Sequence, residues 1–232
     1  MPDFSHRSHE AELMDGEEVS QAEYSACMKD LATVNTLTLA RRPTLSFIGR
    51  ALAARTGETL TVIDVGYGAG DMLHAIARRW GKRLRLIGVD LNPRSEAVAQ
   101  ELAPPGTSIR YVTGDVFTWP EDDPIDLVIS SLVTHHMDDA EIVRFLRWME
   151  TRARLGWLVN DLHRSAVSYQ GFRLLSSAMR WHPFVRHDGP LSIARAFRRD
   201  EWEALLREAG VADTARIAWR FPFRYCVERT RW

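Results

Sequence analysis

Glycines and carboxylates recur in three short segments of the chain. The first, DVGYGAGD at residues 64–71, places glycines at alternate positions, which lets the backbone turn sharply and approach a ligand closely. Asp90 follows Gly70 by 20 residues, a spacing at which an acid can accept both hydroxyls of a ribose. Asp115, directly after Gly114, adds a third carboxylate. In this order and spacing, the three segments predict a site for a nucleoside.

The same residues indicate which nucleoside. Dinucleotide-binding loops read G-x-G-x-x-G, whereas this loop reads G-x-G-x-G with Asp64 two residues before it. Carboxylates at the strand ends would repel a pyrophosphate but attract an ammonium or a sulfonium group. Electrostatics therefore favours S-adenosylmethionine over a nicotinamide dinucleotide.

Histidines supply the candidate bases. An oxygen acceptor benefits from a base, and histidine suits this role near neutral pH. His135 and His136 follow the predicted fourth strand, and His163 follows Asp161. Asp161 either orients the His163 imidazole, or the Asp-Leu-His stretch caps the next helix. Our hypothesis is that His136 or His163 is the base. His187 belongs to His-Asp-Gly-Pro, which is typical of a turn.

The elements that must position these groups follow from apolar periodicity and from helix caps. Strands are predicted at 60–65, 84–90, 109–115, 125–130, 156–161, 215–221 and 223–228. Helices are predicted at 23–39, from 43 onward, and at 71–79, 93–102, 141–149, 166–179 and 199–209. Residues 1 to about 20 are polar and acidic, without clear periodicity, and are expected to be loose.

Alternating strands and helices predict the α/β fold class, with a doubly wound, mostly parallel seven-stranded sheet. The last two strands have no helix between them and must form an antiparallel hairpin, which leaves one reversed edge strand. Residues 1–58 are expected to form a tail and a helical cap, and residues 59–232 the cofactor-binding domain. Its segment at about 163–198 is expected to contact the substrate.

Composition narrows the class of protein. Thirty basic and thirty-one acidic residues give a net charge of −1, without the basic face that nucleic acid demands. Two cysteines exclude a disulfide scaffold or a cysteine zinc cluster and fit a reducing compartment. No apolar signal segment and no membrane span are recognised, so a cytoplasmic protein is expected.

Four stretches, VIDVGYGAGD, LIGVDLNP, VTGDVF and DLVISSLVTHHMDD, resemble the class I S-adenosylmethionine-dependent methyltransferases over roughly residues 59–163. The resemblance implies a cofactor site, with the methionine moiety at Asp64, Gly66 and Gly68, the ribose at Asp90, the adenine at Asp115 and Val116, and Ser130 and Ser131 flanking the cofactor. Leu91, which follows Asp90, is counted in this site. Tyr67 is also counted in this site. It departs from the family, in which a small residue or cysteine is usual, and its ring either covers the cofactor or points away.

The acceptor is inferred from weaker resemblance. GWLVNDLHR, HPFVRHDGP and RFPFRYCV are similar to a bacterial subgroup associated with aromatic polyketide biosynthesis, a branch of secondary metabolism. This implies O-methylation of a phenolic or polyketide-like acceptor, with C-methylation as the alternative. The aromatic and aliphatic residues of 163–198 either line a pocket for a flat acceptor or pack on the sheet.

Other possibilities stay open. Cation-dependent catechol-type relatives carry an Asp at the end of the fourth strand and Asp-Asn after the fifth. In this chain the fourth strand ends in serines and the pair is reversed as Asn160-Asp161, so no metal is expected.

The main rival to an active methyltransferase is a methyltransferase-like module without catalysis. Arg41 and Arg42 either reach the cofactor carboxylate or lie exposed. The sequence leaves open whether the chain forms a homodimer.

Overall fold

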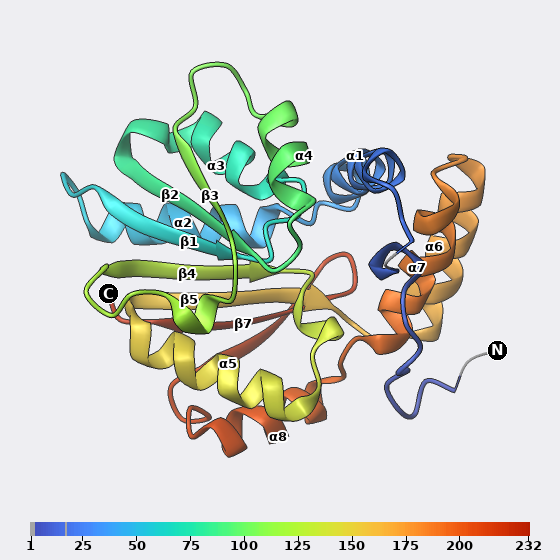
Figure 1. The fold of residues 1–232 in the computed structure, drawn as a ribbon. Coiled ribbons are helices and arrows are strands. Elements are labelled where there is room, and N and C mark those ends of the chain that lie inside the picture. The colour runs from blue at the N-terminus through green and yellow to red at the C-terminus, as the bar shows by residue number, and fades with distance from the viewer. Residues whose placement is uncertain (1–2, 17) are drawn as a thin grey trace.

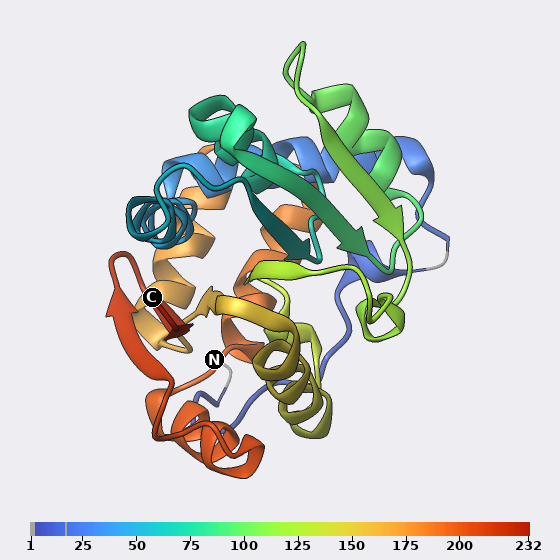
Figure 2. The same cartoon turned by 90° about the vertical axis from the view of Figure 1, so that its left-hand side faces the viewer.

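A computed structural model describes residues 3–16 and 18–232. One sheet of seven strands forms its centre, in the order β3-β2-β1-β4-β5-β7-β6 (Figures 1 and 2). The strands are β1 (Leu60–Val65), β2 (Leu84–Asp90), β3 (Ile109–Thr113), β4 (Ile125–Ser131), β5 (Ala153–Leu162), β6 (Arg216–Arg220) and β7 (Arg224–Thr230). The helices are α1 (Gln21–Leu37), α2 (Arg42–Ala54), α3 (Asp71–Trp80), α4 (Ser95–Leu102), α5 (Asp139–Arg152), α6 (Ala166–Ala178), α7 (Pro183–Arg195) and α8 (Arg199–Ala209).

The predicted doubly wound sheet is confirmed. Strand β1 pairs in parallel with both β2 and β4, so the chain changes direction across the sheet between β1 and β4. Every residue of β1 is buried, as expected for a central strand covered on both faces. Ligands of such sheets bind outside the carboxyl ends of the strands, beside this switch point.

The hairpin is antiparallel, but its reversed strand is not at the edge. Strand β7 pairs with β5 on one side and with β6 on the other, so β6 is the edge strand. Tyr225, Cys226 and Val227 are buried in β7, whereas Arg216, Trp219 and Arg220 of β6 are exposed. The more apolar strand therefore takes the inner position.

Two helical layers cover the sheet. On one face, α2 and α3 contribute Phe47, Ile48 and Leu73 to a core shared with β1 and β2. On the other, α5 and α8 contribute Phe145 and Trp202 to a core shared with β4 and β5. Of the two helices predicted to form an N-terminal cap, α2 thus belongs to the layer that covers the sheet, because its apolar stripe packs on β5 and the neighbouring strands.

The cap is built instead from α1, α6 and α7, which stand beyond the carboxyl ends of the strands (Figure 1). The prediction of a turn at His187–Pro190 is wrong, because these residues lie inside α7. Gly189 allows α6 to approach, since a Cβ there would lie 2.1 Å from Phe172 Cε1. The Asp188 carboxylate is used in a tertiary contact, accepting the Leu13 and Met14 amides at 2.9 and 3.0 Å.

The N-terminal segment is not loose. Residues 3–16 lie along α7 and end in a 3₁₀ turn, Leu13–Asp15. Arg7 fixes the segment by donating to Asp139 at 2.7 Å and to the Met137 carbonyl at 2.8 Å. The expectation of a loose segment rested on polar composition alone. It was wrong because the residues that hold the segment lie far away in the chain. Met1, Pro2 and Glu17 lie outside the described residues. Among the residues that the structure describes, no helix is long and apolar enough to cross a membrane.

Candidate functional site

The glycine loop joins β1 to α3 at the switch point. Gly66, Gly68 and Gly70 have φ angles of 72°, 51° and 70°, in the left-handed region that side chains rarely adopt. A Cβ on Gly66 would lie 2.3 Å from Val133 Cγ2, so the loop also passes too close to its neighbour for another residue. The alternate glycines predicted from the sequence are therefore required by the backbone.

Carboxylates gather around this loop. The Asp90 carboxylate accepts the amides of Gly68 at 2.8 Å and Asn92 at 2.9 Å, which fixes its orientation beside the loop. Asp64 is 2% exposed, and among the described residues its carboxylate has no hydrogen-bond partner. Burial, together with Asp71 and Asp90, raises the pKa of Asp64 well above its usual range. A cation brought next to these groups would be stabilised by all three.

Other residues predicted for the cofactor occupy varied places. Leu91 is exposed and lines the cavity beside Asp90. Asp115 is exposed at a helix start, where it accepts the Phe117 amide at 2.9 Å, and Val116 is buried in the core. Ser130 is buried and donates to the Val65 carbonyl at 3.1 Å, whereas the neighbouring Ser131 lines the cavity.

Tyr67 points away from the loop into the core. Its ring packs where a side chain on Gly88 would lie, 2.6 Å from an added Cβ, and its centroid is 5.0 Å from that of Tyr111. The hydroxyl is buried without a hydrogen-bond partner, and burial raises the pKa of Tyr67 above its usual value. The departure from the family pattern is thus accommodated by Gly88 and leaves the cavity open.

A cavity of about 790 Å³ extends from the glycine loop beneath the cap. Its floor includes Gly66, Gly68 and Asp90, and its walls come mainly from α1, α6 and α7. Most of the wall is apolar, with Met14, Met28, Leu31, Phe172, Leu175, Ile193 and Phe221 among the lining residues. A pocket of this size and lining suits a cofactor and an apolar acceptor together.

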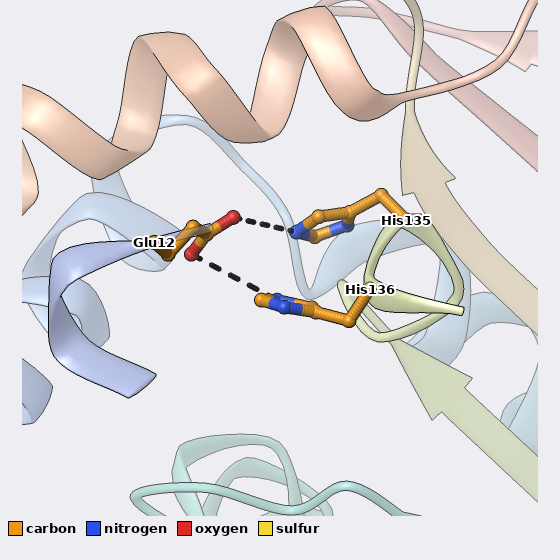
Figure 3. Close-up of side chains that lie close together, drawn as sticks. All are labelled: Glu12, His135 and His136. Carbon is orange, nitrogen blue, oxygen red and sulfur yellow. Dashed lines mark ion pairs between the residues drawn. The ribbon is translucent and has the colours of Figure 1, made fainter. Parts of the chain in front are cut away.

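A polar cluster interrupts the apolar wall, and we call Glu12, His135 and His136 the Glu–His cluster (Figure 3). Glu12 belongs to the N-terminal segment, and the two histidines to the 3₁₀ turn Thr134–His136 that follows β4. Glu12 Oε1 lies 3.8 Å from His135 Nε2, and Glu12 Oε2 lies 3.9 Å from His136 Nε2. Sequence reasoning missed Glu12 because only the folded chain brings the N-terminus to this turn.

Asp161 orients the ring of His135, not that of His163 as in one of the two alternatives from the sequence. Its Oδ1 lies 2.8 Å from His135 Nδ1, and its Oδ2 accepts the Thr134 hydroxyl and the His135 amide. Although burial alone would raise the pKa of Asp161, His135 and the hydrogen bonds hold this pKa well below its usual range. Asp161 therefore stays ionised and locks the ring of His135.

His163 lies outside the cavity. Its Nδ1 accepts from Trp219 Nε1 at 3.3 Å, and its ring centroid lies 4.8 Å from that of Tyr225 in β7. Burial lowers the pKa of His163. His163 directly follows β5, whose last residue, Leu162, lines the cavity. Of the two predicted bases, His136 lines the cavity and His163 does not.

Two arginines, Arg41 and the buried Arg224, lie near the site. Arg41 pairs with Asp71 at 2.7 Å, so its charge is balanced at the start of α3, and Asp71 itself lines the cavity. Arg224 is 3% exposed at the start of β7, and its Nε and Nη1 have no hydrogen-bond partner among the described residues. Burial lowers the pKa of Arg224 to about 10.

These residues fit S-adenosylmethionine. The left-handed glycine loop leaves room for close approach, and Asp90 is oriented with lone pairs free for ribose hydroxyls. The buried, unpartnered Asp64 and its acidic neighbours favour a cationic ligand and disfavour a pyrophosphate. The donor set therefore agrees with the cofactor inferred from the sequence.

Comparison with known proteins finds similarity to methyltransferases over part of the chain. Residues 62–156 match a family model described as a methyltransferase domain. Trans-aconitate 2-methyltransferase of Mycobacterium ulcerans is 29% identical over 118 residues, 50% of this chain and 41% of that protein. Its counterpart in Mycobacterium marinum is 33% identical over 94 residues, 40% of this chain and 32% of that protein. The chain thus spans less than half the length of these relatives.

Solved structures share the fold. The plantazolicin methyltransferase BpumL, in complex with S-adenosylhomocysteine, superposes with a TM-score of 0.65 at 11% identity, covering 91% of this chain and 97% of that one. Magnesium protoporphyrin IX methyltransferase from Synechocystis, also with S-adenosylhomocysteine, gives 0.54 at 18% identity, covering 84% of each chain. Human N-acetylserotonin methyltransferase with S-adenosylmethionine gives a TM-score of 0.58 at 16% identity, covering 91% of this chain and 56% of that one.

The chain therefore has the fold of these methyltransferases, residues 62–156 are similar to a methyltransferase domain, and the residues around the glycine loop fit S-adenosylmethionine as the cofactor.

Proposed function

We propose that this protein transfers a methyl group from S-adenosylmethionine to an oxygen atom of a small phenolic or polyketide-like acceptor. One observation carries the proposal: a single cavity joins the glycine loop and Asp90 to an apolar wall and to the Glu–His cluster. The glycine loop and Asp90 suit the cofactor, and the apolar wall suits a flat apolar acceptor. The Glu–His cluster suits the removal of a proton from the acceptor hydroxyl.

The bound cofactor would supply an electrophilic methyl group, which a direct displacement passes to the acceptor oxygen. In this reaction the protein mainly aligns the two molecules and excludes water. The glycine loop and Asp90 hold one partner, while α1, α6 and α7 enclose the other. We assign removal of the acceptor proton to the Glu–His cluster, in which His136 is the more exposed imidazole, at 32% against 3% for His135.

The charges around the cavity support a phenol over a polyacid. The curated relatives are named for trans-aconitate, which carries three carboxylates. Among the described residues that line the cavity, Arg224 is the one arginine and no lysine is present, while Asp71, Asp90 and Asp188 are acidic. A polyacid would leave most of its charge without a partner, whereas a phenol needs a single proton acceptor and its phenolate a single cation.

Two alternatives remain distinct from this proposal. C-methylation of a similar acceptor would use the same cavity, since activation of a phenol also raises the nucleophilicity of its ring carbons. A module without catalysis would bind the cofactor but transfer nothing. We place the protein in the cytoplasm and in secondary metabolism as part of the proposal, on composition and on the acceptor class.

Calorimetry with S-adenosylhomocysteine tests the cofactor site. The wild-type protein should bind with a Kd in the micromolar range, and Asp90→Ala should weaken binding at least about tenfold, because a charged partner of the ribose is removed. Asp115→Ala is the matched control: its carboxylate is exposed and caps a turn, so a smaller loss is expected. Equal affinity in wild type and Asp90→Ala would contradict this assignment.

A panel of phenols, naphthols and carboxylic acids then tests the acceptor. Mass spectrometry should detect methyl ethers from phenols or naphthols, and fragmentation should separate O- from C-methylated products. Exclusive methylation of a carboxylic acid would overturn the proposed acceptor. Cofactor binding without a product from any class would favour the module without catalysis.

A further inference from the structure

The Glu–His cluster has the composition of a metal site. One ligand atom from each of Glu12, His135 and His136 can be chosen so that all three lie within 4.8 Å of one another. In Figure 3 both imidazoles point toward the same carboxylate, which faces one ring with each oxygen. Two imidazoles and a carboxylate are ligands that transition metals such as Zn²⁺ prefer, whereas Mg²⁺ and Ca²⁺ prefer oxygen.

The distances leave room for an ion between the three groups. The two Glu12–histidine distances, 3.8 and 3.9 Å, exceed the length of a hydrogen bond. Ligands held at about 2.0–2.1 Å from a tetrahedral metal lie roughly 3.3–3.4 Å apart. The three ligand atoms lie within 4.8 Å of one another, so the cluster would need to contract by about 0.5–1.5 Å to bind such an ion, a shift within the reach of side-chain rotation.

The tautomer of His135 supports the same conclusion. Asp161 accepts hydrogen bonds from Thr134 Oγ1 and from two backbone amides, so it acts as an acceptor toward His135 Nδ1 as well. Nδ1 then carries the proton, and in the neutral ring the lone pair of Nε2 points toward Glu12. A lone pair facing a carboxylate oxygen is stabilised by a cation between them. A carboxylate behind a ligating histidine is the usual support of a metal site.

Burial of the cluster is uneven in a way that suits an open coordination position. The side chains of Glu12 and His135 are each 3% exposed, whereas that of His136 is 32% exposed toward the cavity. Three protein ligands with a fourth position open to substrate characterise catalytic zinc sites, while structural sites are closed by four. The open side here is the proposed acceptor pocket.

We propose that Glu12, His135 and His136 bind a divalent transition metal of the Zn²⁺ type, with Asp161 positioning His135. This inference rests on the proposed function and deepens it: the ion would bind the acceptor hydroxyl and lower its pKa, so that the proton leaves to water and the oxygen stays on the metal. The ion then replaces the His136 imidazole as the activating group. The sequence-based expectation of no metal is replaced by this proposal.

Metal titration tests the site directly, without an acceptor. Chelator-treated protein is titrated with Zn²⁺ by calorimetry and with Co²⁺ by absorption spectroscopy. We expect one ion per chain and the visible bands of Co²⁺ in a site of low coordination number. Glu12→Gln and His136→Ala should each weaken binding at least about tenfold, and Asp161→Asn should weaken it about 10–100-fold, because the support of His135 is lost.

The controls separate this inference from the proposed function. His6→Ala removes an imidazole that is 88% exposed and should leave metal affinity unchanged. Binding of S-adenosylhomocysteine by Glu12→Gln, measured in the same preparation, reports that the cavity is folded. The absence of saturable binding, or equal affinity in wild type, Glu12→Gln and His136→Ala, would overturn the metal site. Failure of S-adenosylhomocysteine to bind would instead overturn the proposed function.

Discussion

The phenol of Tyr67 shows how one side chain can depart from a family pattern without closing the site. The ring is turned into the core over Gly88, where the absence of a side chain leaves space for it. Its hydroxyl forms no hydrogen bond among the described residues and is buried. The rest of the loop keeps its left-handed glycines, so the cavity floor is unaffected.

Tyr67→Phe should therefore leave S-adenosylhomocysteine affinity within about threefold of wild type. Removal of an unsatisfied buried hydroxyl should leave the free energy of unfolding unchanged or raise it by about 1 kcal/mol. Urea unfolding and calorimetry measure the two quantities. A large loss of affinity would mean that the hydroxyl reaches the cofactor.

Tyr111→Phe is the matched control for this substitution. Its hydroxyl lies 2.8 Å from His74 Nε2, and burial raises the pKa of Tyr111 to about 12. Loss of this bond should lower the free energy of unfolding by about 1 kcal/mol, the opposite direction to Tyr67→Phe.

At the scale of elements, the bond between His74 and Tyr111 ties α3 to β3 behind the glycine loop. His74 is 3% exposed, and burial lowers its pKa from 6.5 to about 4. Between these two values the unfolded chain binds a proton that the folded chain does not. The free energy of unfolding must therefore fall as the pH drops from about 6.5 to about 4.

His74→Gln should remove this contribution, which is on the order of 3 kcal/mol over that pH range. Urea unfolding of both proteins at several pH values between 4 and 7 measures it. The variant should have a flatter pH dependence than wild type, whatever its stability at pH 7. Buried carboxyls with raised pKa values change the free energy of unfolding with pH in the opposite direction. They are present in both proteins, so their contribution cancels when the two pH curves are subtracted. Parallel pH curves would show that His74 titrates normally.

At the scale of the whole molecule, the N-terminal segment closes the site by reaching across it. Arg7 donates to Asp139 and Met137, and its guanidinium lies 4.1 Å from the centre of the Phe197 ring. These contacts hold residues 3–16 against α7, and with them Glu12 against the two histidines. The segment thus couples closure of the cavity to completion of the Glu–His cluster.

Arg7→Ala should release this segment. Hydrogen exchange should become faster at the amides of Ser8, Leu13 and Met14, which donate to Ala194 and Asp188 in the closed form. Metal affinity should fall as in Glu12→Gln, while S-adenosylhomocysteine affinity should change little. Arg85→Ala, which breaks a surface pair with Asp123, is the control and should leave all these quantities unchanged. Unchanged exchange in Arg7→Ala would mean that other contacts hold the segment.

The sequence by itself determined the parts of this protein whose causes are local. Alternate glycines predict the backbone conformation of the loop, and acids at strand ends predict its charge. Because the carboxyl ends of parallel strands lie at one edge of the sheet, Asp64, the loop and Asp90 are expected to lie close together. The class of fold follows from the same alternation of strands and helices. The inner position of β7 and the helical state of His187–Pro190 did not follow, because burial against distant elements decided them.

Only the tertiary structure decided how the acceptor side is assembled. Glu12 lies beside His135 and His136, although more than 120 residues separate them in the chain. Asp161 contacts His135, although His163 is its near neighbour in sequence. No local pattern encodes such pairings, since they depend on where the N-terminal segment, β5 and the turn after β4 place their side chains. The cofactor side could be predicted because it lies on consecutive strand ends. The Glu–His cluster could not, because Glu12 and the two histidines come from segments far apart in the chain.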